Sequence, residues 1–335
     1  MHKQLAMGNL ENTGMREMVG KCVSKLAEKA ASESSSGVLG ISSGFRQLDR
    51  RIGGFENGKV YVVGGRPSMG RDDFMLSVVD NILRHTELPI LLFTTNKRKT
   101  DSFSRLMSIH FSIPTTKIYE GGLELEEWCR LDKGLKTIAD VPLFIYDSLT
   151  PSLHEVMETI RNYVREKGEI IVFIDCLQMI DLRNENGNPS ERTAKVMASL
   201  KQMAIQENLP VIVGSMLNNT ADIHEKNGSK RPDLTSLSDS NYMEEFADVI
   251  MFVHRPEQYR IYKDENGQNL HGKIQILVRK NAFRPVCEIT LHYQQKTGAV
   301  GTKEEASLFV TKPAKVEEAF ENLMETFDLE EVVPF

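Results

Sequence analysis

Residues 65–72 have the spacing of a loop that binds phosphate groups. Four residues separate Gly65 from Gly70, and the basic residue Arg71 follows the second glycine. In such a loop the backbone N–H groups and the start of the following helix surround a phosphate, and glycines let the backbone approach it closely. The predicted phosphate ligands are Gly65, Pro67, Ser68, Met69, Gly70, Arg71 and Asp72. The alternative is a plain turn between a strand and a helix that happens to contain two glycines.

Two side chains of this loop differ from the pattern G-x-x-x-x-G-K-S/T, in which the lysine holds phosphate and the hydroxyl holds Mg²⁺. The lysine position is Arg71, which keeps the positive charge but presents it as a planar fork. The hydroxyl position is Asp72. A carboxylate there could bind a metal, but it also places negative charge beside the phosphates. That charge opposes phosphate binding unless Mg²⁺ lies between the two groups.

A second carboxylate, Asp175, ends the apolar run 170–175. An aspartate at the end of such a strand can reach a Mg²⁺ ion bound to phosphate. Many buried strands end in aspartate, so this interpretation depends on the nearby phosphate loop. We therefore expect Asp72 and Asp175 to be the metal ligands if the site holds a metal.

Short β-branched runs alternate with longer helical stretches between residues 38 and 300. This alternation predicts an α/β fold with a mostly parallel, twisted sheet and helices on both faces. The predicted strands are 60–64, 90–94, 143–146, 170–175, 211–215 and 249–254, and the predicted helices include 72–85, 153–167 and 190–207. Residues 273–278 and 286–293 are predicted to form an antiparallel pair at the sheet edge, after a turn at 264–267.

The composition is that of an ordinary globular protein, with 40% hydrophobic and 26% charged residues. No uninterrupted apolar run approaches about 20 residues, so we expect no membrane span, and the amino terminus lacks the apolar core of a signal peptide. The four cysteines form no C-x-x-C pair, which is typical of isolated thiols in a reducing compartment. These features predict a cytoplasmic protein. The net charge of −6 argues against a generally basic nucleic-acid-binding surface, but not against a local basic loop or ring pore.

Several runs of sequence, in order along the chain, resemble the C-terminal RecA-like motor domain of DnaB-type replicative helicases. The similar runs lie at residues 43–49, 53–58, 66–70, 175–179, 215–218, 230–232 and 247–252. Residues 66–70, R-P-S-M-G, match the phosphate loop of the family letter for letter. The resemblance covers roughly residues 38–300 and implies a RecA-like phosphate-loop fold, ATP-dependent DNA helicase activity and a hexameric ring. We expect the N-terminal domain of the family to be absent.

The departures from the family cluster at the nucleotide site. Asn96 stands where the family has a glutamate that orients the attacking water, and asparagine can hydrogen-bond a water but cannot take its proton. Met216 replaces a glutamine. Val278 and Lys280 align with a K-x-R pair that acts in trans. Loss of a trans arginine alone can cost about 10³-fold or more in related phosphate chemistry.

The DNA-contacting loop of the family, R-E-S-G-S, reads S-D-S-N-Y in this chain, at residues 238–242. Ser238, Asp239 and Asn241 are the corresponding DNA-binding candidates. The loop has lost its cation, so we expect one phosphate contact fewer in each subunit.

The two ends of the chain are predicted to lie outside the main domain. Residues 13–31 form a predicted amphipathic helix with a flexible tether at 32–37, where the family has a linker helix that packs on the neighbouring subunit. The acidic tail ends in Pro334 and Phe335 and resembles the tip of bacterial single-stranded-DNA-binding proteins, which docks into basic pockets of replication partners. The alternative is an acidic helix that packs on the domain. The predicted domains are 1–37, 38–300 and 301–335.

Three hypotheses for function follow. In the first, a DnaB-like replication protein with impaired or absent ATP hydrolysis acts as a helicase paralogue, loader or regulator. It would form a homo-oligomeric ring or a mixed ring with a helicase, with single-stranded DNA and replisome proteins as partners. The second is a working replicative helicase with relocated catalytic groups, for which the candidates are Arg66, Lys97, Arg98 and Arg279. The third is a nucleotide-free scaffold for protein contacts. Whether the chain is an enzyme, and whether it uses ATP and Mg²⁺ or neither, depends on the substituted site.

Overall fold

In the computed structural model the chain divides into two compact units, Met1–Leu39 and Gly40–Phe335. The structure describes residues 15, 18–20, 23, 24, 38–95, 97–181, 189–217, 230–237, 240–282 and 284–301, without the side chains of 136, 137, 189, 240 and 241. In the first unit, residues 15, 18–20, 23 and 24 are helical, and the four apolar side chains among them are exposed. The rest of the helix predicted at 13–31 lies outside the described residues, as does the tail beyond residue 301.

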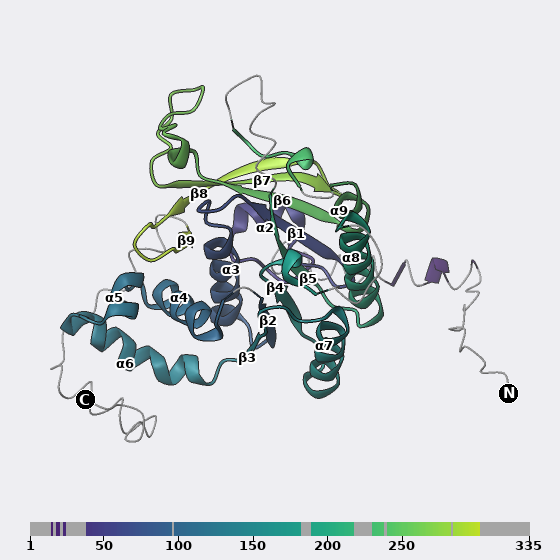
Figure 1. Cartoon of the computed structure of the whole chain (residues 1–335), viewed down its shortest axis with the longest axis horizontal. Helices are drawn as coiled ribbons and strands as arrows, with labels where there is room; N and C mark the ends of the chain where they lie inside the picture. The colour runs from purple at the N-terminus through teal and green to yellow at the C-terminus, as the bar shows by residue number, and fades with distance from the viewer. Residues whose placement is uncertain are drawn as a thin grey trace. The chain divides into compact units, whose positions relative to one another are not determined.

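The sheet of the second unit is mostly parallel (Figure 1). The described residues form nine strands in the order β3-β2-β4-β5-β1-β6-β7-β8-β9. The strands from β3 to β6 pair in parallel, and β7, β8 and β9 add an antiparallel edge. Their bounds are β1 Val60–Gly65, β2 Ile90–Thr94, β3 Leu143–Asp147, β4 Ile171–Ile174, β5 Val211–Met216, β6 Val249–His254, β7 Lys273–Asn281, β8 Cys287–Tyr293 and β9 Val300–Gly301. This arrangement confirms the predicted fold class.

Helices cover both faces of the sheet, with α3 and α4 on one face and α7, α8 and α9 on the other (Figure 1). Strands buried on both faces read as continuous apolar runs, which is why the sequence predicted them well. The α-helices are α2 Arg46–Ile52, α3 Arg71–His85, α4 Lys99–Phe111, α5 Thr115–Glu120, α6 Leu125–Ala139, α7 Leu153–Lys167, α8 Pro189–Gln206 and α9 Ser240–Phe246. The 3₁₀ helices are η1 Leu177–Met179, η3 Leu234–Ser236 and η4 Pro256–Tyr259.

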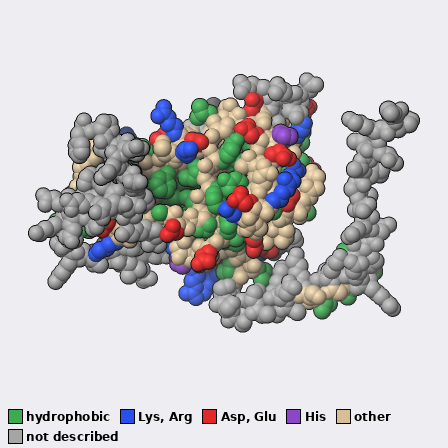
Figure 2. Space-filling view, turned by 90° about the horizontal axis from the view of Figure 1, so that it is seen from below, with side chains coloured by type: hydrophobic (Ala, Val, Ile, Leu, Met, Phe, Trp, Pro, Cys, Tyr) green, Lys and Arg blue, Asp and Glu red, His purple; other side chains and the backbone are tan. Residues whose placement is uncertain are grey.

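The surface seen in Figure 2 carries acidic and basic side chains interspersed, with hydrophobic side chains showing between them. This face therefore has no uniform positive charge of the kind that a broad nucleic-acid-binding surface would need. Among the described helices, none combines the length and the hydropathy that crossing a membrane requires.

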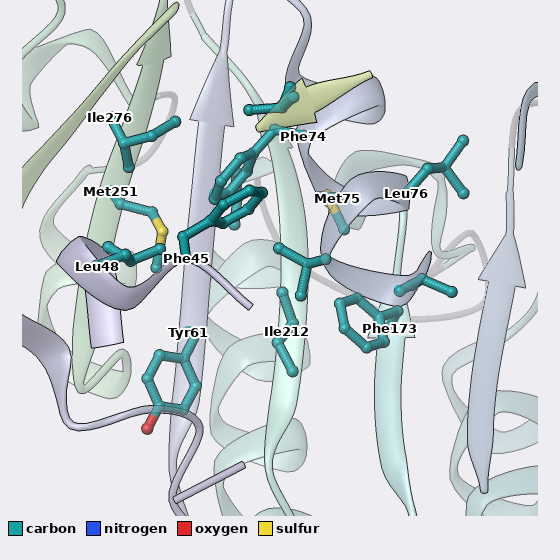
Figure 3. Packing of buried hydrophobic residues seen from close by; sticks show 14 of the residues in the cluster. Phe45, Leu48, Tyr61, Phe74, Met75, Leu76, Phe173, Ile212, Met251 and Ile276 are labelled. Carbon is teal, nitrogen blue, oxygen red and sulfur yellow. The ribbon is translucent and has the colours of Figure 1, made fainter. Parts of the chain in front are cut away.

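The core on the α3 face is rich in aromatic side chains (Figure 3). Phe45, just before α2, stacks on Phe74 of α3 with ring centres 5.7 Å apart. Tyr61 of β1, Ile212 of β5 and Phe173 of β4 point to the same face, whereas their chain neighbours belong to the core on the opposite face. Packing on both sides holds the carboxyl ends of the parallel strands in place, and these ends carry the candidate site.

Candidate functional site

The predicted phosphate loop joins β1 to α3 at the carboxyl edge of the parallel strands. β1 is buried along its whole length, and Gly65 at its end lies opposite Met216 of β5 and Val253 of β6. α3 begins at Arg71, and its N-cap Gly70 has a φ of 82°. A side chain is disfavoured in this left-handed region, so glycine suits the turn into the helix.

Arg71, Asp72 and Lys97 form a cluster of ion pairs beside the loop. Arg71 Nε donates to Asp72 Oδ1 at 2.9 Å, and Arg71 Nη2 lies 2.7 Å from the same oxygen. Lys97 Nζ donates to the other carboxylate oxygen, Oδ2. Both oxygens of Asp72 therefore have cationic partners, one from α3 and one from the segment that follows β2.

The carboxylate of Asp72 is stabilised in its charged form. Burial by itself would raise its pKa, but Arg71 and Lys97 together hold the pKa below its ordinary value. Asp72 also lies in the first turn of α3, where the helix dipole favours negative charge. The carboxylate is consequently ionised at neutral pH. It pairs with Arg71, the cation that a phosphate loop would otherwise offer to a phosphate.

Asp175 follows β4 directly and is a buried neighbour of the same cluster. Its Oδ1 accepts hydrogen bonds from the Thr95 hydroxyl at 2.9 Å and from the Thr95 N–H at 3.3 Å. Burial raises the pKa of Asp175 and nearby Asp72 raises it further, against the opposing effects of Thr95 and Lys97. The two carboxyl groups of the site thus have opposite tendencies, because Asp72 is held charged and Asp175 takes a proton more readily than usual.

The predicted metal ligands, Asp72 and Asp175, are engaged by protein groups in this arrangement. Mg²⁺ needs oxygen ligands in near-octahedral geometry. Both oxygens of Asp72 have cationic partners, and the pKa of Asp175 is raised. Within the part of the chain that the structure describes, no three or more His, Cys, Asp or Glu side chains are grouped as a metal site. The metal role of Asp72 and Asp175 stays a prediction.

A small cavity adjoins the ion cluster, between α3, β2 and α4. Its polar wall includes Asp72 and Lys97 of the cluster and the Thr94 hydroxyl, which is buried and has no hydrogen-bond partner among the described residues. Such a wall could accept a small group that hydrogen-bonds to Thr94. The full lining is Asp72, Met75, Leu76, Val79, Leu92, Thr94, Lys97, Ser102, Arg105 and Asp175.

Met216 ends β5 at the same edge of the sheet as the loop. Its side chain is 39% exposed, and its backbone N–H donates to Gln178 Oε1 at 3.1 Å. Gln178 Nε2 in turn donates to the Ser215 hydroxyl at 2.9 Å. Gln178 thus ties η1 to the end of β5, and the thioether of Met216 has no acid–base chemistry to offer.

Lys280 of β7 is engaged within its own chain. Its Nζ donates to the carbonyl oxygen of Glu244 and, at 2.7 Å, to that of Ala247, at the carboxyl end of α9. A bulge interrupts the β6–β7 pairing here. Val278 belongs to the core on the α3 face, so the two positions aligned with the K-x-R pair lie on opposite faces of the sheet. Whether Lys280 acts in trans stays a prediction.

The remaining predicted site residues cannot be placed by their side chains. Asn241 belongs to α9, but its side chain is outside the described residues. The other predicted residues outside the described part are Asn96, Ser238, Asp239, Pro334 and Phe335.

Arg255 and Tyr293 also lie beside the loop, although no sequence motif marked them. The guanidinium carbon of Arg255 is 3.8 Å from the ring centre of Tyr293, and its Nη1 donates to the carbonyl of Ser68 at 3.4 Å. The Tyr293 hydroxyl donates to Asp73 Oδ2 at 2.7 Å. Arg255 directly follows the predicted strand 249–254, and residues that follow parallel strands are candidates for a site. Only the strand order, which puts this strand beside β1, shows that Arg255 lies next to the loop.

Comparison with known sequences supports the resemblance found in the motifs. A sequence model described as the DnaB-like helicase C terminal domain matches residues 40–300. The chain is 31% identical over 264 residues to a probable replicative DNA helicase of Trieres chinensis, covering 78% of this chain and 57% of the relative. It is 29% identical over 279 residues to the replicative DNA helicase DnaB of Pasteurella multocida (strain Pm70), covering 82% and 58%. The chain thus spans less than two thirds of the length of these relatives.

Two solved structures share the fold. The ATPase domain of G40P has a TM-score of 0.76 at 24% identity, covering 85% of this chain and 98% of that one. A DnaB-like replicative helicase, described with its interactions with primase, has a TM-score of 0.74 at 24% identity, covering 87% and 67%. At this identity the likeness establishes the arrangement of strands and helices.

Proposed function

The chain belongs to the DnaB-like helicase C-terminal domain family, and from this premise we propose that it is a DnaB-like protein of DNA replication with impaired or absent ATP hydrolysis. Its role would be that of a helicase paralogue, a loader or a regulator. The observation that carries the proposal is the Asp72 carboxylate, which engages both Arg71 and Lys97 beside the phosphate loop. Phosphoryl transfer depends on such cations being free to stabilise the phosphate charge.

Asp72 opposes phosphate binding in two ways. It competes for the cations, and it repels the phosphate as a like charge. Two unit charges 4 Å apart interact by about 4 kcal/mol at an effective dielectric of about 20, which is enough to weaken binding greatly if nothing neutralises them. Both oxygens of Asp72 are engaged by Arg71 and Lys97, so a metal ion between Asp72 and the phosphate would first have to displace these cations.

Two further groups that hydrolysis needs are also changed. Asn96 replaces the residue that would take the proton of the attacking water, and an amide has no such basicity. Lys280, the predicted trans-acting cation, donates its ammonium to carbonyl oxygens of its own chain. The changes at Asp72, Asn96 and Lys280 affect phosphate binding, activation of the water and the trans-acting cation. Together they support loss of turnover more strongly than any one of them alone.

The partners are proposed on the same basis. We expect a homo-oligomer, hexameric by resemblance, or a mixed ring with a helicase, acting in the cytoplasm near single-stranded DNA. ATP and Mg²⁺ would be bound weakly or not at all. Because a DnaB-like helicase of this fold is described with its interactions with primase, primase is a partner to test. The acidic tail that ends in Pro334 and Phe335 would dock on a replisome protein.

The test is ATP turnover by the purified chain with Mg²⁺, with and without single-stranded DNA, alongside its mass in solution. We expect no turnover above background under either condition. Robust hydrolysis stimulated by DNA would overturn the proposal and favour a working helicase with relocated catalytic groups.

A set of restoring substitutions sharpens this test. Arg71→Lys, Asp72→Thr and Asn96→Glu together should bring back measurable hydrolysis if the rest of the site is intact. The matched control replaces the neighbouring aspartate instead, as Arg71→Lys, Asp73→Thr and Asn96→Glu. It leaves Asp72 in place and should stay inactive.

A nucleotide-free scaffold is the second candidate, and the ion-paired state of Arg71 and Lys97 favours it. Only the first candidate allows the chain to bind nucleotide. Titration with a non-hydrolysable ATP analogue tests this: measurable binding without turnover supports the first candidate and contradicts the scaffold.

A further inference from the structure

The Asp72 carboxylate is held in the manner of a bound anion. Arg71 approaches one oxygen through two nitrogens, Nε at 2.9 Å and Nη2 at 2.7 Å. Lys97 Nζ donates to the other oxygen. A phosphate at the start of a helix is held in a similar way, by cationic side chains on several of its oxygens and by the helix end.

The backbone is shaped to keep Arg71 in this position. A Cβ at Gly65 would lie 2.8 Å from the Cβ of Arg71 and 3.4 Å from its Cγ, so only glycine lets this side chain lie against the end of β1. Arg71 is 8% exposed. The guanidinium is therefore a fixed, buried cation directed at Asp72, unlike a surface side chain that pairs by chance.

The two cations nearest the loop are engaged without a ligand. Arg71 and Lys97 both bond to the Asp72 carboxylate. A loop with lysine and a hydroxyl at these two positions would leave its cation available to a phosphate. In this chain an incoming phosphate gains neither Arg71 nor Lys97 until Asp72 leaves.

We propose that Asp72 is an internal competitor of phosphate ligands, and that pyrophosphate groups bind this loop only by displacing its carboxylate from Arg71 and Lys97. The proposal rests on the proposed function, because it gives a physical reason for the loss of hydrolysis. It goes further by assigning Lys97 as a second anion ligand of the loop.

The experiment is calorimetric titration of inorganic pyrophosphate, without Mg²⁺, into the full chain and its Asp72→Asn variant. This substitution keeps the shape of the side chain and removes its charge. We expect the variant to bind pyrophosphate at least about tenfold more tightly than the parent chain. The matched control is Asp73→Asn, which changes the net charge equally on the next residue of α3. Its carboxylate bonds to the Tyr293 hydroxyl and pairs with Arg105, not with Arg71 or Lys97, so the affinity should match that of the parent.

A double variant tests the role of Lys97. Adding Lys97→Met to Asp72→Asn should remove most of the gained affinity, because the second cation is lost. Equal affinity of the parent and Asp72→Asn, an equal gain from Asp73→Asn, or a gain that survives Lys97→Met would each overturn the proposal.

Two further arms keep the result interpretable. If Asp72→Asn fails to fold, as judged by circular dichroism, Asp72→Ser takes its place with the same expectation. ATP turnover by the parent chain would refute the proposed function. By contrast, an inactive parent whose affinity for pyrophosphate does not improve in the Asp72 variants would refute only the internal competitor.

Discussion

Lys97 and Asp72 are hydrogen-bonded side chain to side chain, although 25 positions separate them in the sequence. Asp72 lies in the first turn of α3, and Lys97 lies between β2 and α4. The pair therefore joins two elements in the wall of the cavity. A hydroxyl at position 72 would carry no charge, so the ion pair between these two elements exists only because a carboxylate stands there.

Removing the Asp72 carboxylate should destabilise the fold. Asp72→Ala is expected to lower the free energy of unfolding by about 2–4 kcal/mol, because Arg71 would keep a buried charge without its main partner. Urea unfolding followed by circular dichroism measures the loss. Glu166→Ala is the control, since Glu166 is 67% exposed and pairs with Lys167 at the surface. Its effect should stay below about 0.5 kcal/mol, and equal losses would contradict the prediction.

His254 should make stability depend on pH. Burial, with the charges of Arg231 and Arg66, lowers its pKa to about 4. The unfolded chain has an ordinary histidine pKa of about 6.5, so it binds the proton more strongly as pH falls from 6.5 to 4, and the folded state loses up to about 3 kcal/mol. His254→Phe keeps the ring stacked on Tyr259 and should remove this loss. Urea unfolding between pH 4 and 7 measures the loss, and an identical pH dependence in the parent and His254→Phe would contradict the prediction.

Gly214 should tolerate no side chain. A Cβ at this position in β5 would lie 2.1 Å from the carbonyl oxygen of Asp175. Gly214→Ala must push β4 and β5 apart, and we expect a loss of about 1–3 kcal/mol in the free energy of unfolding. Gly20→Ala is the control, because a Cβ there would meet nothing within 4 Å. Equal melting temperatures for the two variants would show that the strands can move apart freely.

Lys280 should act as a structural residue. Lys280→Met would leave the carbonyl oxygens at the end of α9 without their charged donor, and we expect a loss of about 1–2 kcal/mol. Arg279→Met is the matched control, since Arg279 pairs with Glu288, which is 41% exposed. Its loss in chemical unfolding should be below about 1 kcal/mol. A neutral effect of Lys280→Met would leave this lysine free for contacts in trans.

Much of the sheet could be predicted from the sequence. The strands at 60–64, 90–94 and 249–254 were found within one residue, because strands buried on both faces are continuous apolar runs. The order of those strands could not be predicted. Each is apolar on both faces, so the residues carry no information about which neighbour each strand pairs with.

The sequence by itself determined that residues 65–72 form a loop between a buried strand and a helix, since glycine spacing and apolar runs are local features. It also determined that the side chains at 71 and 72 depart from the phosphate-loop pattern. Only the tertiary structure decided that Asp72 is paired on both sides, and that Lys97, Arg255 and Tyr293 reach the same edge. The physical reason is that ion pairs and ring contacts between distant residues depend on strand order and side-chain direction. Neither of these is encoded in any short stretch of the chain.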